Sequence, residues 1–295
     1  MSEPSTMQIA MARSATPHRI ASRRNGSRRI GGILRWVFLG LAVVAVLFPL
    51  YWTFALATQD PVDSFGTPQF LFVPRFDAFV TVWGDQGFIS AALMSLTTTV
   101  LTVGLTLAIT IPAAYILTRR RVRAQVGLIA WLFVAYLFPD FLIAIPLYAV
   151  LQNIGLYDSA LGLALAYQGF MAPLAMWLLL AFFRSVPEEL AQAATLDGCS
   201  AWQTLRRVYL PIVMPGVATV AILVSIQVWN EVTIALALTS SNPTIPIVVA
   251  SYKGYAALKW DQLAAASLLS MLPVVIFAMF AQRQIVRGLT AGVGK

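Results

Sequence analysis

Six apolar segments, each long enough to cross a bilayer as a helix, constrain the fold of this chain more than any other feature. A helix of about 20 residues spans a hydrocarbon core of about 30 Å. Of the 295 residues, 59% are hydrophobic and only 11% are charged, which is too little charge to cover a water-soluble domain of this length. The sequence therefore predicts an all-α membrane protein with six transmembrane helices. They are expected at 36–56, 88–117, 125–150, 159–183, 212–238 and 262–282.

Basic residues are concentrated in alternate loops. Most of the 20 lysines and arginines lie in four places: the N-terminal tail, the loop after the second predicted span, the loop after the fourth, and the C-terminal end. Only Arg75, Lys253 and Lys259 lie elsewhere. Such residues are retained on the cytoplasmic side of a membrane, so we expect both termini in the cytoplasm. Residues 1–35 are predicted to be a disordered basic tail, and residues 36–295 a six-span domain. The net charge of +8 follows from arginines that flank spans, so the expected partner is the lipid bilayer and not a nucleic acid.

Residue types that support metal or nucleophilic chemistry are scarce. The chain has one histidine, His18, and one cysteine, Cys199, so a His/Cys metal cluster cannot form. The C-terminal GLTAGVGK has the wrong spacing for a phosphate-binding loop and lacks the Ser or Thr that would hold magnesium. We therefore expect no catalytic residue, no metal and no cofactor in this chain, and no ATP hydrolysis by the chain alone.

A polar insert, residues 184–211, separates the fourth and fifth spans. The stretches SVPE (185–188) and SAWQ (200–203) each match a capping box, and Gly198 suits the left-handed residue that ends a helix. They predict a short helix, a glycine corner and a second helix that ends at Pro211. The first helix carries acids and alanines, whereas lipid-bound helices favour Lys, Arg, Trp and Phe. This favours docking into a protein groove, with a helix lying on lipid as the alternative.

The insert resembles a known family. The stretch PEELAQAATLDGCSAWQTLRRVYLPIVMPG (187–216) looks like the EAA loop of permease subunits in binding-protein-dependent ABC importers. WNE (229–231), AAASLLSMLP (264–273) and QRQIVRGLTAG (282–292) resemble the carbohydrate branch, the maltose-type permeases. The resemblance covers the chain from the first span onward. It departs from the family at Gln192, where the family has glutamate, and in the final AGVGK.

The resemblance implies the type I ABC importer permease fold and a subunit that forms half of a carbohydrate pathway in the inner or plasma membrane of a prokaryote. The implied partners are a second homologous permease, an extracytoplasmic sugar-binding protein and a cytoplasmic dimer of ATP-binding subunits. ATP and magnesium would be bound by those ATPase subunits. The first helix of the insert would dock into the ATPase and transmit its closure to the spans.

Three groups of contact residues follow from the resemblance. ATPase coupling would involve Glu188, Glu189, Gln192, Ala193, Ala194, Leu196, Asp197 and Gly198. The C-terminal residues that face the ATPase would be Leu289, Thr290, Ala291 and Gly292. The loop that reaches into the binding protein would include Ser240, Ser241, Asn242, Pro243 and Thr244, with a plain connector as the alternative.

Polar residues inside membrane spans are costly and are usually functional. They either line a cavity that offers hydrogen bonds to sugar hydroxyls or bond between helices, and the sequence leaves both interpretations open. These residues are Asp140, Gln168, Gln227, Trp229, Asn230 and Glu231.

Two other classes of function are alternatives. An ion-coupled secondary transporter would use Asp140 and Glu231 as a proton relay, but it would leave the capped insert unexplained. A membrane scaffold that transports nothing would have no ATPase as a partner.

Overall fold

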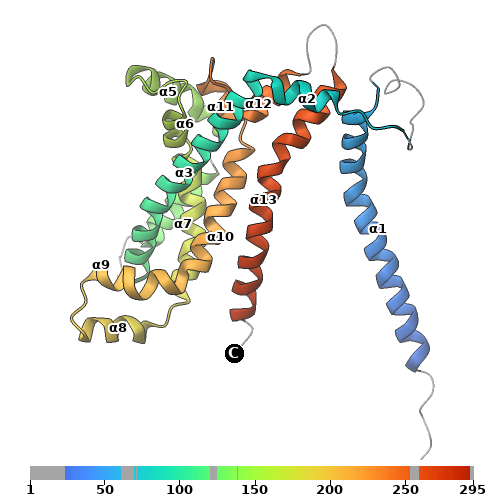
Figure 1. Cartoon of the computed structure of the whole chain (residues 1–295). Coiled ribbons are helices and arrows are strands. Elements are labelled where there is room, and N and C mark those ends of the chain that lie inside the picture. Colours follow the sequence, from blue (N-terminus) through green and yellow to red (C-terminus); the bar gives the residue numbers. More distant parts are fainter. Residues whose placement is uncertain are drawn as a thin grey trace, which may run out of the picture. The chain divides into compact units, whose positions relative to one another are not determined.

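The structure is a computed structural model that describes residues 24–60, 70, 72–119, 125–137, 139–252 and 259–292. Within these ranges the chain forms helices and no strand, which confirms the all-α prediction (Figure 1). The chain divides into two compact units, Met1–Trp52 and Thr53–Lys295.

The described residues of the first unit belong to α1 (Arg24–Thr58), whose last six residues fall beyond the boundary at Trp52. Its segment Arg35–Thr58 is long and apolar enough to cross a membrane. Its large apolar side chains, such as Phe38 and Val46, are exposed, as expected for a helix that faces lipid. The helix begins before the predicted span, so the tail predicted to be disordered overlaps α1 over residues 24–35. The rest of that tail lies outside the described residues.

Four long helices build the second unit: α3 (Gln86–Arg119), α7 (Gln168–Arg184), α10 (Leu210–Trp229) and α13 (Trp260–Gly292). α3 packs along α7, and α10 packs against α3, α7 and α13. The main core lies among α3, α7 and α10 and contains Leu179, Phe183 and Val220, all buried. Apolar side chains on the outside of the bundle, such as Val100 and Trp177, remain exposed.

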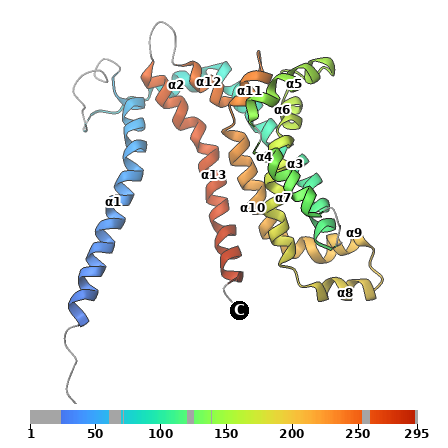
Figure 2. The same ribbon diagram turned by 180° about the vertical axis from the view of Figure 1, so that it is seen from behind.

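Short helices occupy the two ends of this bundle (Figures 1 and 2). One end, called here the α8 end, carries α8 (Glu188–Leu196) and α9 (Ala201–Thr204). The other, called the α11 end, carries five helices. They are α2 (Asp77–Gly84), α5 (Asp140–Asn153), α6 (Ala160–Ala166), α11 (Thr233–Leu238) and α12 (Ile245–Ser251).

Four of the six predicted spans have a single long apolar helix in the structure, in Arg35–Thr58, Gln86–Arg119, Ala201–Trp229 and Trp260–Phe280. The predicted third span, 125–150, is divided between α4 (Gln125–Tyr136) and α5. Pro139 precedes α5 with extended backbone (φ −63°, ψ 124°), and a proline cannot donate the hydrogen bond that would continue the helix. A continuous third span was therefore wrong.

The predicted fourth span, 159–183, is also broken. α6 and α7 meet at Tyr167 with a bend of 53°. At the bend the side chain of Gln168 donates to the carbonyl of Ala164 at 2.8 Å, so a side chain satisfies an acceptor that a straight helix would satisfy with backbone. The predicted fifth span, 212–238, ends early at Trp229, and α11 is a separate helix.

The start of α6 packs closely against the turn that precedes it. A Cβ on the buried Gly162 would collide with the backbone carbonyl of Leu156, whereas a Cβ on the exposed Gly169 would meet open space. We expect Gly162→Ala to destabilise the protein by about 1–3 kcal/mol because a backbone atom cannot move aside as a flexible side chain can. Thermal melts of the purified protein compare it with the matched control, Gly169→Ala. Equal melting temperatures would contradict this packing.

Candidate functional site

The α8 helix starts in a different way from the prediction. Ser185 is the C-cap of α7, with helical backbone angles (φ −77°, ψ −11°), and its hydroxyl donates to the carbonyl of Phe182 at 2.8 Å. An N-cap residue needs extended backbone, and here Pro187 has it (φ −56°, ψ 137°) without a side-chain cap. The capping box proposed for SVPE was therefore wrong, although the helix that follows it exists.

The corner after α8 agrees with the prediction. Gly198 has φ +76°, and the N–H of Cys199 donates to the carbonyl of Ala194 at 2.9 Å, as in a glycine-terminated helix. The second capping box is present as well: the N–H of Gln203 donates to Ser200 Oγ at 3.3 Å and the N–H of Ser200 donates to Gln203 Oε1 at 2.8 Å. These local motifs fix the direction in which the chain returns towards the spans.

α8 buries one narrow face and exposes the rest. The buried residues of α8 are Ala191 and Ala194. Ala191, together with Val186 just before the helix, belongs to the core that also contains Leu205. Of the residues predicted to dock on an ATPase, only Ala194 is buried, and the others are exposed. Leu196, the last residue of the helix, is 89% exposed.

The helix after the corner does not end at Pro211, which corrects the prediction. It runs without a break from Ala201 to Trp229 and includes a π-helical turn, η2 (Leu205–Tyr209). The N–H of Leu210 donates to the carbonyl of Leu205, five residues earlier. This wider turn lets the helix pass Pro211, which lacks an N–H, and π-helical turns are frequent at functional sites.

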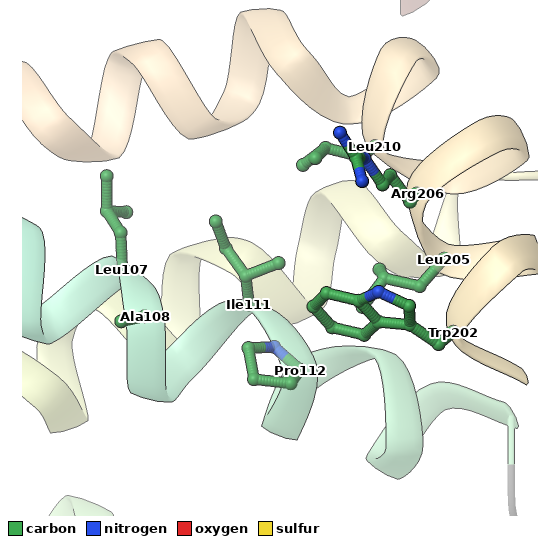
Figure 3. A pocket seen from close by; sticks show the side chains of 8 residues that line it. All are labelled: Leu107, Ala108, Ile111, Pro112, Trp202, Leu205, Arg206 and Leu210. Atoms are coloured by element: carbon green, nitrogen blue, oxygen red, sulfur yellow. The ribbon is translucent and has the colours of Figure 1, made fainter.

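A cavity of about 300 Å³ lies between the start of this helix and α3 (Figure 3). Trp202 points across it towards Ile111 and Pro112 of α3. The lining residues are Leu107, Ala108, Ile111, Pro112, Trp202, Leu205, Arg206 and Leu210. The cavity is partly open to the surface, while Leu205 on its lining is buried in the main core.

Tyr209 fastens the same helix on its other side. Its ring lies edge-on to Tyr115 of α3 at 5.1 Å and stacks on Phe183 of α7 at 6.0 Å. The guanidinium of Arg119 lies 5.6 Å from the Tyr115 ring and 5.8 Å from the Tyr209 ring, and it donates to Tyr115 Oη at 2.9 Å. Sequence reasoning missed this cluster, because its members come from three distant helices and follow no local motif.

Three of the predicted pathway residues form hydrogen bonds to other parts of the protein through their polar side-chain groups. The amide oxygen of Gln168 accepts from Thr106 Oγ1 at 2.9 Å, which joins α7 to α3. Trp229 is buried, and its indole N–H donates to the carbonyl of Ser270 in α13 at 3.0 Å.

Glu231 accepts three hydrogen bonds. They come from Tyr167 Oη at 2.8 Å and from the N–H groups of Ile234 at 2.7 Å and Ala235 at 3.0 Å. The carboxylate thus caps the start of α11 and ties it to the bend between α6 and α7. This arrangement agrees with the interhelical interpretation of the polar residues.

The remaining predicted pathway residues are placed differently. Gln227 is exposed on α10, and Asn230 is exposed at its end, where its amide donates to the carbonyl of Ile226 at 2.7 Å. Asp140 begins α5, but its side chain lies outside the described residues. Gln227 and Asn230 are therefore the described members of the set whose side chains are exposed.

The other two groups of candidate residues lie at opposite ends of the bundle. Ser240, Ser241 and Asn242 are exposed in the loop that joins α11 to α12 at the α11 end, next to the intermediate Pro243 and the buried Thr244. The C-terminal candidates Leu289, Thr290, Ala291 and Gly292 form the last turn of α13, and their side chains lie outside the described residues. Within the described residues there is no group of three or more His, Cys, Asp or Glu that could hold a metal.

The capping role of Glu231 can be separated from a pathway role. We expect Glu231→Ala to lower the free energy of unfolding by about 3 kcal/mol, because it leaves a hydroxyl and two buried N–H groups without an acceptor. Tyr167→Phe, the matched control, removes one of these donors and should cost about 1 kcal/mol. Denaturation of the purified protein measures both. If Glu231→Ala leaves stability unchanged but reduces uptake, the residue acts in the pathway.

The structure is that of a multi-pass membrane protein of the permease class. Its helices expose apolar surfaces, its capped insert is exposed at the α8 end of the bundle, and broken helices lie at the α11 end. Residues 109–291 match the family model described as "Binding-protein-dependent transport system inner membrane component". The chain belongs to this family, whose members are non-catalytic permease subunits of ABC importers. This membership supports the permease interpretation over an ion-coupled transporter or a scaffold.

Individual proteins agree with this assignment. The chain is 33% identical to the probable ABC transporter permease protein y4oR of Sinorhizobium fredii, over 92% of this chain and 99% of that protein. It is 32% identical to the trehalose transport system permease protein SugB of Mycobacterium tuberculosis, over 88% and 97%. A chain of a bacterial ABC transporter that imports alginate has the same fold, with a TM-score of 0.75, 24% identity, and coverage of 89% of this chain and 99% of that chain.

Proposed function

We propose that this chain is one of two permease subunits of an ATP-driven carbohydrate importer in the inner or plasma membrane of a prokaryote. It forms half of the pathway together with a second, homologous permease. The ATP and magnesium are bound by a cytoplasmic dimer of ATPase subunits, and the sugar is delivered by an extracytoplasmic binding protein.

The exposed surface of α8 is the observation that carries this proposal. The helix buries two small side chains, Ala191 and Ala194, and exposes Glu188, Glu189 and the adjoining Asp197. Exposed acids call for a basic groove on the partner, and the exposed Leu196 provides an apolar anchor at the end of the helix. Gln192 is exposed within the same surface and offers a neutral hydrogen bond where the family has a charge.

The surroundings of α8 supply a route for movement. Gly198 and the capping box at Ser200 connect α8 rigidly to the helix that becomes α10. That helix is fastened at Tyr209 but borders the cavity beside α3. A displacement of α8 by the ATPase would therefore be passed to α10 instead of being absorbed in a flexible loop.

A carbohydrate is supported by the relatives and by the exposed polar side chains. SugB carries the name of a trehalose transport permease, and the WNE and C-terminal stretches resemble the carbohydrate branch. Gln227 and Asn230 are exposed and offer amide groups that can hydrogen-bond to sugar hydroxyls. The loop with Ser240 to Thr244 would meet the binding protein at the opposite end from α8.

Substitutions at Gly198 test the coupling role of the corner. A Cβ there meets open space, so the penalty for Gly198→Leu comes from the left-handed backbone alone, about 1–2 kcal/mol. We expect the leucine variant to reduce uptake by about ten-fold in the reconstituted transporter while the basal ATPase rate remains. Gly198→Asn is the matched control, because asparagine tolerates this conformation. Wild-type uptake and ATPase stimulation in the leucine variant would overturn the proposal.

A further inference from the structure

The loop between α11 and α12 is held by one carboxylate that comes from a distant part of the chain. Asp158 lies between α5 and α6 and accepts hydrogen bonds from the backbone N–H groups of Ser240 at 2.8 Å, Ser241 at 3.0 Å and Asn242 at 3.1 Å. The N–H of Asp158 in turn donates to the carbonyl of Leu238 at 3.2 Å. Successive amides that converge in this way form an anion-binding nest, and the protein itself supplies the anion.

Asn242 adds side-chain bonds to the same residue. Its Nδ2 donates to the backbone oxygen of Asp158 at 3.1 Å and to the carboxylate at 3.3 Å. Burial opposes ionisation of Asp158, but the bonds from the three amides and from the Asn242 side chain outweigh it and lower the pKa of this carboxyl. A carboxylate that accepts several backbone bonds remains charged at neutral pH.

Asp158 is itself fixed in an uncommon backbone conformation. Its φ is +57°, which makes it the single non-glycine residue with positive φ in the described part of the chain. Gly155 (φ +70°) precedes it, and Ser159 follows as the N-cap of α6, with Oγ accepting from the N–H of Gly162 at 3.1 Å. Left-handed backbone is costly for most residues and is tolerated by Asp and Asn. The turn therefore holds the carboxylate in one place.

Both ends of the clamped loop are also anchored. Leu238, Thr239 and Thr244 are buried, and the N–H of Ile245 donates to Ser95 Oγ at 2.8 Å. Between these anchors, small exposed polar residues would be flexible without the carboxylate, because fixing one residue costs about 1–2 kcal/mol of conformational entropy. A loop that is ordered before binding avoids that cost when it binds.

We propose that Asp158 is a positioning residue that holds loop 239–244 in the conformation in which it meets the extracytoplasmic binding protein. This inference rests on the proposed function, in which this loop contacts the binding protein. The carboxylate fixes the backbone from behind, while Ser240, Ser241 and Asn242 keep their side chains exposed for the partner.

Two substitutions separate the carboxylate from the backbone conformation. Asp158→Asn keeps the shape and the tolerance of positive φ but removes the charge and turns a donor towards the amides. Asp158→Gly relieves the backbone and removes the side chain. Asn153→Ala, an exposed change at the end of α5, is the matched control.

The first measurement reports on the loop directly. A nitroxide is attached at Ser241→Cys in a Cys199→Ser background, which is free of other cysteines, and the whole transporter is studied in lipid nanodiscs. We expect a restricted spectrum with Asp158 and with the control, and a mobile spectrum with either Asp158 variant. Restricted spectra in both Asp158 variants would overturn the clamp.

The second measurement tests docking. A photo-crosslinking residue at Ser241 is used in cells to capture the binding protein, which mass spectrometry identifies. We expect the concentration of that protein for half-maximal ATPase stimulation to rise about ten-fold in both Asp158 variants, with the maximal rate unchanged. A merely structural role would lower the maximal rate and leave the half-maximal concentration unaltered.

The outcomes distinguish the positioning role of Asp158 from the docking of loop 239–244 on the binding protein. If Ser241 captures a solute-binding protein but the half-maximal concentration does not change in either variant, the role of Asp158 is wrong and the docking of the loop stands. If Ser241 captures no extracytoplasmic binding protein while the transporter is active, the docking role fails, and the inference about Asp158 fails with it.

Discussion

Every backbone N–H and carbonyl group in the hydrocarbon region must find a partner within the protein, because lipid offers none. Continuous helices meet this demand by themselves, but this chain breaks several of its apolar helices near the α11 end. At three sites near this end a polar side chain bonds to the backbone: Gln168 at the bend before α7, Glu231 at the start of α11 and Asp158 at the loop beyond it. The break before α5 differs, because Pro139 begins that helix without a side-chain cap. The architecture at the other three sites depends on these polar side chains.

The two ends of the bundle are held together by different kinds of contact. At the α11 end, Glu231 and Asp158 tie segments that are distant in sequence into one rigid arrangement. At the α8 end, short-range motifs form the corner at Gly198 and Ser200, and a cavity lies between the following helix and α3.

Features that depend on neighbouring residues were predictable from the sequence. The apolar runs, the left-handed Gly198 and the capping box at Ser200 follow from composition and spacing over a few residues. Ser185 matched the same capping pattern but is the C-cap of α7, because the pattern alone cannot say where the preceding helix stops. The contacts of Tyr209 and Asp158 join distant segments, and no local signal announces them.

The central claim is that the exposed face of α8 is held by an ATPase subunit. The most direct test places a photo-crosslinking residue at Leu196, which is 89% exposed, and at the buried Ala191 as a control, in cells that produce the whole transporter. The account predicts that Leu196 captures a nucleotide-binding ATPase and that Ala191 does not. Capture of lipid alone from Leu196, in cells that import substrate at the normal rate, would contradict it.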